Sequence, residues 1–216
     1  MRELNGIQVP RTLEDVCRSD RMALVVYDMQ VGILRQLKDG PSIVQRVLRV
    51  VETARQTGMR VIFMRHMSLP LKLMGASQIR MAMAWQGIED PAAVQPWFLR
   101  NSPGFEIVPE LTPRADEAIL DKITMSAFEG TPLAMALRDC GLTAFAIVGV
   151  AMEIGIDPTV RHGADLGLIP VIIKDACGAG DEAAAQRSLE SLAFLGDAIE
   201  TDMETFRRLL ARKSAE

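Results

Sequence analysis

The chain has 216 residues, of which 49% are hydrophobic and 24% are charged, and its formal net charge at pH 7 is −4. This length and composition are typical of a folded protein with a sizeable core and argue against disorder. An acidic chain without a basic run is a poor partner for nucleic acid, and no apolar run approaches the ~20 residues that a membrane span needs.

The first part of the chain predicts one β-α-β unit. No linker-like stretch divides the sequence, so we expect a single domain over residues 1–216, with residues 1–20 as an N-terminal arm that is irregular or forms a short helix. Residues 22–27 are a continuous apolar run, the pattern of a strand covered on both faces. Apolar residues recur at helical spacing over residues 42–56, and residues 60–64 read as the next strand.

Residues 68–103 follow no clear period. They hold several methionines and both tryptophans among glycines and prolines. This composition suits a long excursion that covers a pocket or forms a subunit contact, and a surface helix that contributes to the core is an equally open interpretation.

Strands and helices alternate over the rest of the chain. We expect strands at residues 118–120, 143–148, 169–173 and 198–201, and helices at residues 131–139, 158–166, 182–195 and 203–212. Alternation of this kind predicts an α/β fold with a doubly wound, mostly parallel sheet.

Polar side chains stand where three of the predicted strands end. Asp28 follows the first strand, Lys122 follows the third, and a turn at residues 149–156 follows the fourth. The first and fourth strands flank the switch point of a doubly wound sheet, so these ends can share one crevice. A carboxylate beside an ammonium in an apolar crevice suits proton transfer, and an ion pair that only ties two strand ends together is the alternative.

Four motifs then resemble landmarks of the isochorismatase-like hydrolase superfamily, also known as the cysteine-hydrolase fold. They are Tyr27-Asp28-Met29-Gln30, the Lys-Ile-Thr-Met-Ser-Ala-Phe-Glu-Gly-Thr stretch at residues 122–131, Gly149-Val150-Ala151, and Asp175-Ala176-Cys177. The resemblance extends over about residues 21–201. It implies a three-layer α/β/α, Rossmann-like fold with a six-stranded parallel sheet, and a homo-oligomer, either a dimer or a tetramer.

Most members of that superfamily are cysteine amidohydrolases. The resemblance gives Asp28 the role of base and Lys122 that of charge stabiliser, and a cysteine beyond the turn would attack a carbonyl carbon. Gly155 stands at that cysteine position. Hydrolysis through a covalent thioester therefore has no nucleophile here.

The turn resembles instead the isochorismatases proper, which hydrolyse a vinyl ether without a covalent enzyme intermediate. In that branch the residue matching Asp28 is a general acid, and Gly155 would leave room for a substrate ring or a water molecule. Lys122 should favour the ionised form of Asp28, so either burial or a substrate carboxylate that neutralises Lys122 would have to raise the pKa of this carboxyl again. The resemblance also implies a cis peptide bond between Val150 and Ala151.

The cysteines and histidines form no metal or disulfide pattern. Cys17, Cys140 and Cys177 are odd in number, widely spaced and without a CxxC pair, and His66 and His162 stand apart from other potential ligands. We expect reduced thiols, a cytoplasmic protein, and no metal or other cofactor.

Together these observations predict a cofactor-independent hydrolase that acts on a small enol-ether or carbonyl acid, with no membrane or nucleic-acid partner. The expected catalytic residues are Asp28, Lys122 and Gly155, and the expected substrate-binding residues are Gln30, Val150, Ala151 and Glu153. Four arginines are candidates for holding a substrate carboxylate: Arg65, Arg80, Arg100 and Arg161. Two alternatives stay open, namely a non-catalytic binding or oligomeric relative and an amidase that uses Cys177 or an activated water molecule.

Overall fold

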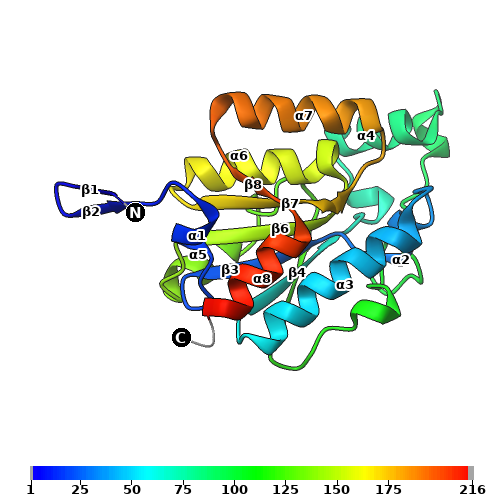
Figure 1. Cartoon of the computed structure of the whole chain (residues 1–216). Coiled ribbons are helices and arrows are strands. Elements are labelled where there is room, and N and C mark those ends of the chain that lie inside the picture. Colours follow the sequence, from blue (N-terminus) through cyan, green and yellow to red (C-terminus); the bar gives the residue numbers. More distant parts are fainter. Residues whose placement is uncertain (1, 214–216) are drawn as a thin grey trace.

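The computed structural model describes residues 2–213, and a parallel six-stranded sheet lies at its centre (Figure 1). The strand order is β5-β4-β3-β6-β7-β8, and every pairing in the sheet is parallel. The strands are β3 (Met22–Tyr27), β4 (Arg60–His66), β5 (Ala118–Lys122), β6 (Ala144–Val150), β7 (Ile169–Gly178) and β8 (Ile199–Thr201). This arrangement confirms the predicted α/β class and the doubly wound, three-layer order.

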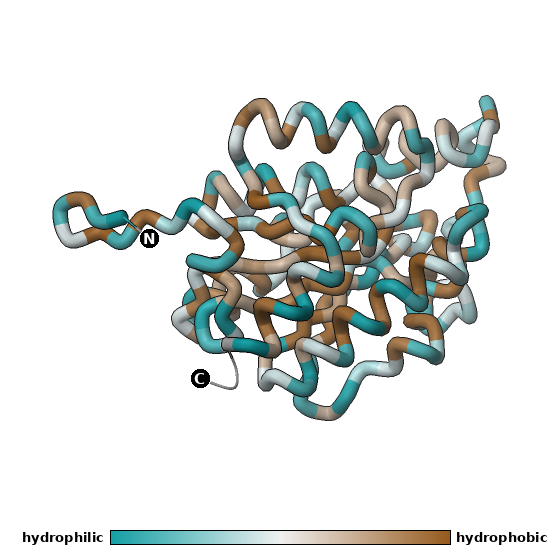
Figure 2. The backbone as a smooth tube through the Cα atoms, viewed as in Figure 1, coloured by the Kyte–Doolittle hydropathy of each residue, from teal (hydrophilic) through white to brown (hydrophobic). Residues whose placement is uncertain are grey.

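Helices cover both faces of the sheet and divide the core into two hydrophobic clusters. One cluster joins the sheet to α3 (Gly40–Gln56) and α8 (Met203–Lys213). The other joins it to α5 (Leu133–Asp139), α6 (Asp157–Asp165) and α7 (Glu182–Leu195). In Figure 2 the hydrophobic colour gathers along the strands between these layers. All residues of β3 and β6 are buried, as expected for strands with helices on both sides.

The direction in which successive strands are added to the sheet reverses between β3 and β6. These two strands are neighbours and pair from Met22 to Tyr27. The strands that follow β3 lie on one side of it, and those that follow β6 lie on the other. This is the switch point at which the ends of parallel strands open a crevice.

The N-terminal arm is a hairpin, which the sequence analysis did not anticipate. β1 (Arg2–Leu4) and β2 (Ile7–Val9) pair antiparallel and extend away from the body in Figure 1, and α1 (Leu13–Val16) follows. The missed signal is Asn5-Gly6, because both residues have positive φ and this dipeptide favours a tight hairpin turn.

The remaining segments are short. They comprise α2 (Val31–Leu34), α4 (Ala76–Gln86), the π-helix η4 (Met152–Ile156) and the 3-10 turns η1 (Leu71–Leu73), η2 (Pro91–Ala93) and η3 (Pro109–Leu111). Asp181 and Asp202 cap the helices that follow them by accepting hydrogen bonds from Ala184 N and Thr205 N. No helix within residues 2–213 combines the length and the hydropathy needed to cross a membrane.

Candidate active site

Asp28 leaves the end of β3 in a left-handed conformation, with a φ of 50°. Its backbone N–H donates to Met64 O on the neighbouring strand at 3.1 Å, and its side chain is almost fully buried. Few residues other than glycine adopt positive φ, and aspartate is among those that do so most readily. The left-handed backbone at Asp28 therefore turns the chain out of the sheet directly after β3.

The buried side chain of Gln30 fixes the same turn through hydrogen bonds to the backbone. Its Nε2 donates to His66 O at 3.0 Å and to Phe105 O at 2.8 Å, and its Oε1 accepts from His66 N at 2.6 Å. The side chain is fully buried and does not line the pocket described below. The structure therefore corrects the expected substrate contact of Gln30, because its amide already serves three backbone groups.

Lys122 and Asp28 form a buried ion pair across the intervening strand β4. Lys122 Nζ donates to Asp28 Oδ2 at 2.8 Å and to Thr124 O at 3.3 Å, and it lies 4.2 Å from the centroid of the Tyr27 ring. The Lys122 side chain has no exposed surface. Its ammonium is thus committed to one oxygen of Asp28.

Burial decides the protonation of this pair. Removal from water raises the pKa of Asp28 to about 6, and this effect outweighs the opposing charge and hydrogen bond of Lys122. Burial also lowers the pKa of Lys122. The second carboxylate oxygen, Asp28 Oδ1, is buried and has no hydrogen-bond partner among the described residues. Asp28 can therefore carry a proton near neutral pH on an oxygen that no described residue engages in a hydrogen bond.

The turn after β6 begins with a cis peptide bond between Val150 and Ala151, as the resemblance implied. The π-helix η4 follows it and leads directly into α6. The N–H groups of Ile154, Gly155 and Ile156 all donate to Ala151 O, at 3.1 to 3.3 Å. The turn is thus closed by its own backbone.

Gly155 packs against Tyr27, and this contact corrects the expected open space. A Cβ atom at position 155 would lie 2.0 Å from Tyr27 Oη, closer than any real contact. The Tyr27 ring is fully buried, and its hydroxyl donates to Met125 O. The side chain of Tyr27 fills the place where the first atoms of a cysteine side chain would stand. Gly155 therefore provides room for a tyrosine of the same chain and not for a water molecule or a substrate ring.

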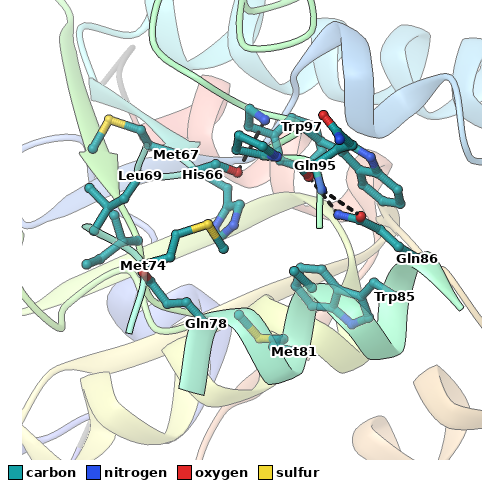
Figure 3. A pocket seen from close by; sticks show the side chains of 15 residues that line it. His66, Met67, Leu69, Met74, Gln78, Met81, Trp85, Gln86, Gln95 and Trp97 are labelled. Atoms are coloured by element: carbon teal, nitrogen blue, oxygen red, sulfur yellow. Dashed lines mark hydrogen bonds between the residues drawn. The ribbon is translucent and has the colours of Figure 1, made fainter. Parts of the chain in front are cut away.

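A pocket of about 240 Å³ opens beside Asp28. Val150 and Ala151 line it, and residues of the segment 68–103 form part of its wall. The lining residues are Tyr27, Asp28, Ile33, Gln36, His66, Trp85, Trp97, Phe98, Met125, Val150, Ala151 and Ile154. A second, smaller pocket of about 40 Å³ shares His66, Trp85, Trp97 and Phe98 with it, and Figure 3 shows the tryptophans around this space, near the Gln86–Gln95 hydrogen bonds.

Glu153 lies elsewhere, which corrects its expected role as a substrate-binding residue. Its Oε1 accepts from Gly180 N at 2.8 Å and from Asp181 N at 2.9 Å, so it fixes the loop before α7. It does not line the Asp28 pocket.

Cys177 is also separate from Asp28. It lies within β7, where its thiol donates to Ile147 O at 3.7 Å, and burial raises its pKa well above the usual range. It lines a different pocket, together with Asp175, Gly178 and Asp181. A protonated thiol outside the Asp28 pocket is a poor nucleophile for that site.

None of the four candidate arginines lines the Asp28 pocket. Arg65 and Arg100 both pair with Asp121, at 2.8 and 2.9 Å, and Arg161 pairs with Asp157 at 2.6 Å. Within residues 2–213, no group of three or more histidine, cysteine, aspartate or glutamate side chains is placed to hold a metal ion.

The sequence analysis missed Tyr27 and His66 as lining residues. His66 ends β4 in register with Lys122, so its position at a strand end was a signal that was available. Tyr27 belongs to the apolar run of β3, and nothing in that run separates it from core residues.

Comparison with known proteins agrees with this fold. The isochorismatase domain model matches residues 22–203. Ureidoacrylate amidohydrolase RutB of Serratia proteamaculans (strain 568) is 25% identical over 206 residues, which cover 88% of this chain and 82% of the relative.

Two solved structures share the fold. A cysteine hydrolase from Pseudomonas syringae pv. phaseolicola 1448A has a TM-score of 0.77 at 24% identity, over 90% of this chain and 94% of its own. The pyrazinamidase of Pyrococcus horikoshii, in complex with zinc, has a TM-score of 0.70 at 23% identity, over 84% of this chain and 99% of its own. Since the family model spans most of the sequence, the chain belongs to the isochorismatase family of hydrolases.

Proposed function

We propose that the protein hydrolyses a small enol ether or carbonyl compound in the Asp28 pocket, with Asp28 as general acid and without a covalent enzyme intermediate. The observation that carries this proposal is the asymmetry of the carboxyl group. Oδ2 accepts a hydrogen bond from Lys122, whereas Oδ1 has no hydrogen-bond partner among residues 2–213, and burial brings the pKa of Asp28 to about 6. With such a pKa, about a tenth of the molecules carry the proton at pH 7.

In this reaction, protonated Asp28 transfers its proton to the terminal carbon of the enol ether, which leaves an oxocarbenium ion. A water molecule adds to the cationic carbon and returns a proton to the Asp28 carboxylate. The resulting hemiketal transfers its hydroxyl proton to the ether oxygen and releases an alcohol and a ketone. The role of Lys122 is to stabilise the carboxylate between the two proton transfers, because its ammonium lies 2.8 Å from Oδ2.

Several features support a route without a thiol. Gly155 occupies the expected nucleophile position, and Tyr27 fills the space above it. The Cys177 thiol lines another pocket and keeps its proton. The relatives named above as amidohydrolase, cysteine hydrolase and pyrazinamidase therefore support hydrolysis in general, and the proposal departs from amide cleavage through a cysteine.

Three further expectations belong to the same proposal. The protein works without a metal or other cofactor, it forms a homo-oligomer, and residues 1–216 act as one catalytic domain. Size-exclusion chromatography with light scattering measures the oligomeric state, and activity after dialysis against a chelator measures the dependence on metal.

The test is turnover of a panel of small enol ethers and amides by the wild-type protein and by Asp28→Asn. We expect Asp28→Asn to lower kcat/KM on an enol ether by about 10² to 10⁴-fold, because it removes the acid and keeps the side-chain shape. Glu153→Gln is the matched control, since its amide oxygen can still accept from Gly180 N and Asp181 N. Full activity in Asp28→Asn would refute the mechanism, and no turnover of any compound would favour a binding protein.

A further inference from the structure

The walls of the Asp28 pocket are aromatic and aliphatic. Trp85, Trp97 and Phe98 come from the segment of residues 68–103, and Val150 and Ile154 come from the turn after β6. Both tryptophans and Ile154 remain 40% to 43% exposed even though they line the pocket. Exposed apolar surface gathered around a pocket marks a place for an apolar ligand.

Among the described residues, no lysine or arginine lines this pocket. The nearby ammonium of Lys122 is fully buried and already paired with Asp28, and Arg65 is paired with Asp121. A carboxylate that entered the pocket would lose its water shell, gain no cationic partner and lie close to Asp28. The lining therefore argues against the acidic substrate that the sequence analysis expected.

Two lining residues, Asp28 and His66, each keep one buried polar atom without a partner in the described part of the chain. These atoms are Asp28 Oδ1 and His66 Nδ1. His66 makes edge contacts with Trp85 and Phe98, with ring centroids 6.3 and 5.9 Å away. Burial lowers the pKa of His66 to about 3, so its ring stays neutral and offers one hydrogen bond as donor or acceptor, according to its tautomer. Unsatisfied buried groups cost free energy, which a ligand with matching polar atoms recovers.

We propose that the natural substrate is uncharged and flat, with an aromatic or unsaturated ring among Trp85, Trp97 and Phe98 and a neutral polar head, such as an enol-ether group, at Asp28 and His66. The size fits, because about 240 Å³ is below the range of drug-sized sites and suits one or two rings. The smaller pocket beyond His66 offers space for a substituent on the ring (Figure 3). The substrate class rests on the proposed function for its reaction, whereas its binding is tested independently.

The experiment compares ligands that differ only in charge. Calorimetric titrations at pH 7.5 would use 2-naphthamide against 2-naphthoate and benzamide against benzoate. We expect each amide to bind at least about tenfold more tightly than its carboxylate. Equal affinity, tighter binding of the carboxylate, or no detectable binding of either amide would overturn the inference.

Two variants locate the preference in this pocket. Trp97→Ala should weaken amide binding about tenfold, because it removes part of the aromatic wall. Gln36→Arg places a cation at the exposed rim and should shift the preference towards the carboxylate. Gln45→Arg makes the same charge change on the exposed face of α3, outside the pocket, and should leave the preference unchanged. An identical shift in both arginine variants would contradict the proposed location.

Binding and turnover separate the two proposals. Selective amide binding together with Asp28-independent hydrolysis would refute the mechanism and keep the substrate class. Asp28-dependent hydrolysis together with equal binding of amides and carboxylates would refute the substrate class alone.

Discussion

At the ends of β3 and β5 two charged side chains are buried as a pair, whereas in the π-helix after β6 a glycine allows a tyrosine ring to pack against the backbone. The Asp28–Lys122 pair contributes little to stability, because removing two charges from water offsets most of their attraction. The Tyr27–Gly155 contact, by contrast, is the close packing of a ring against a residue that has no side chain. One end of the site therefore holds two buried charged groups, and the other end is filled by the packing of an aromatic ring against the backbone.

The largest expected effect comes from breaking the charged pair. Lys122→Met leaves Asp28 buried without its cation, which should lower the free energy of unfolding by about 3–5 kcal/mol at pH 8. The loss should be much smaller at pH 5. Without Lys122 the pKa of folded Asp28 rises further above its unfolded value, so the folded state keeps a proton at low pH and loses stability as the pH rises through the folded pKa.

Urea denaturation at both pH values measures this difference. Lys174→Met serves as the control, because the ion pair of Lys174 with Glu200 is half-exposed and should contribute little. A Lys122→Met variant that loses equal stability at pH 5 and pH 8 would contradict the account of the pair.

The packed end of the site is expected to give an intermediate effect. Gly155→Cys alone should destabilise the protein by about 1–3 kcal/mol, because its Cβ would collide with Tyr27. Tyr27→Val combined with Gly155→Cys should cost less than the sum of the two single substitutions, because the smaller side chain removes the collision, and should expose a thiol beside Asp28. A double-mutant cycle of unfolding free energies measures the coupling.

Thiol labelling adds a second measurement, with Cys140→Ser as background because Cys140 is an exposed cysteine. We expect the new thiol at position 155 to react in the double variant. Independent, additive effects of the two substitutions would show that Tyr27 and position 155 do not share space.

The pH dependence of kcat/KM is expected to show a smaller change, per pH unit, than the substitutions above. If Asp28 acts as a general acid, only its protonated form reacts, so kcat/KM should be level below pH about 6 and then fall about tenfold for each further pH unit. A steady-state pH profile measures this limb. A rate that rises through the same range would assign Asp28 as a base.

The sequence predicted the sheet well where one strong local pattern decided the outcome. The apolar run of β3 and the periodic helix α7 were placed with the bounds that the structure has. β7 runs on to Gly178, beyond its predicted end at residue 173, because Lys174 and Asp175 interrupt the apolar run while the backbone pairing resumes at Cys177.

The site was predictable in its charged half and not in its packed half. Asp28 directly follows β3 and Lys122 is the last residue of β5, so the topology of parallel sheets brings them to the same edge. Tyr27 and Gly155 meet only through tertiary packing, and no local pattern tells that a side chain from β3 fills the space beside a glycine in the π-helix. The same limit applied to Gln30, whose three backbone partners are visible only in the folded chain.

In the proposed reaction, hydrolysis depends on Asp28 and on no cysteine. The most direct test of this dependence is kcat/KM, on the best substrate of the panel, for a cysteine-free protein that carries Cys17→Ala, Cys140→Ser and Cys177→Ala, compared with Asp28→Asn. We predict that the cysteine-free protein keeps activity within about twofold of wild type while Asp28→Asn loses about 10² to 10⁴-fold. Loss of activity in the folded cysteine-free protein, with activity retained in Asp28→Asn, would contradict the claim.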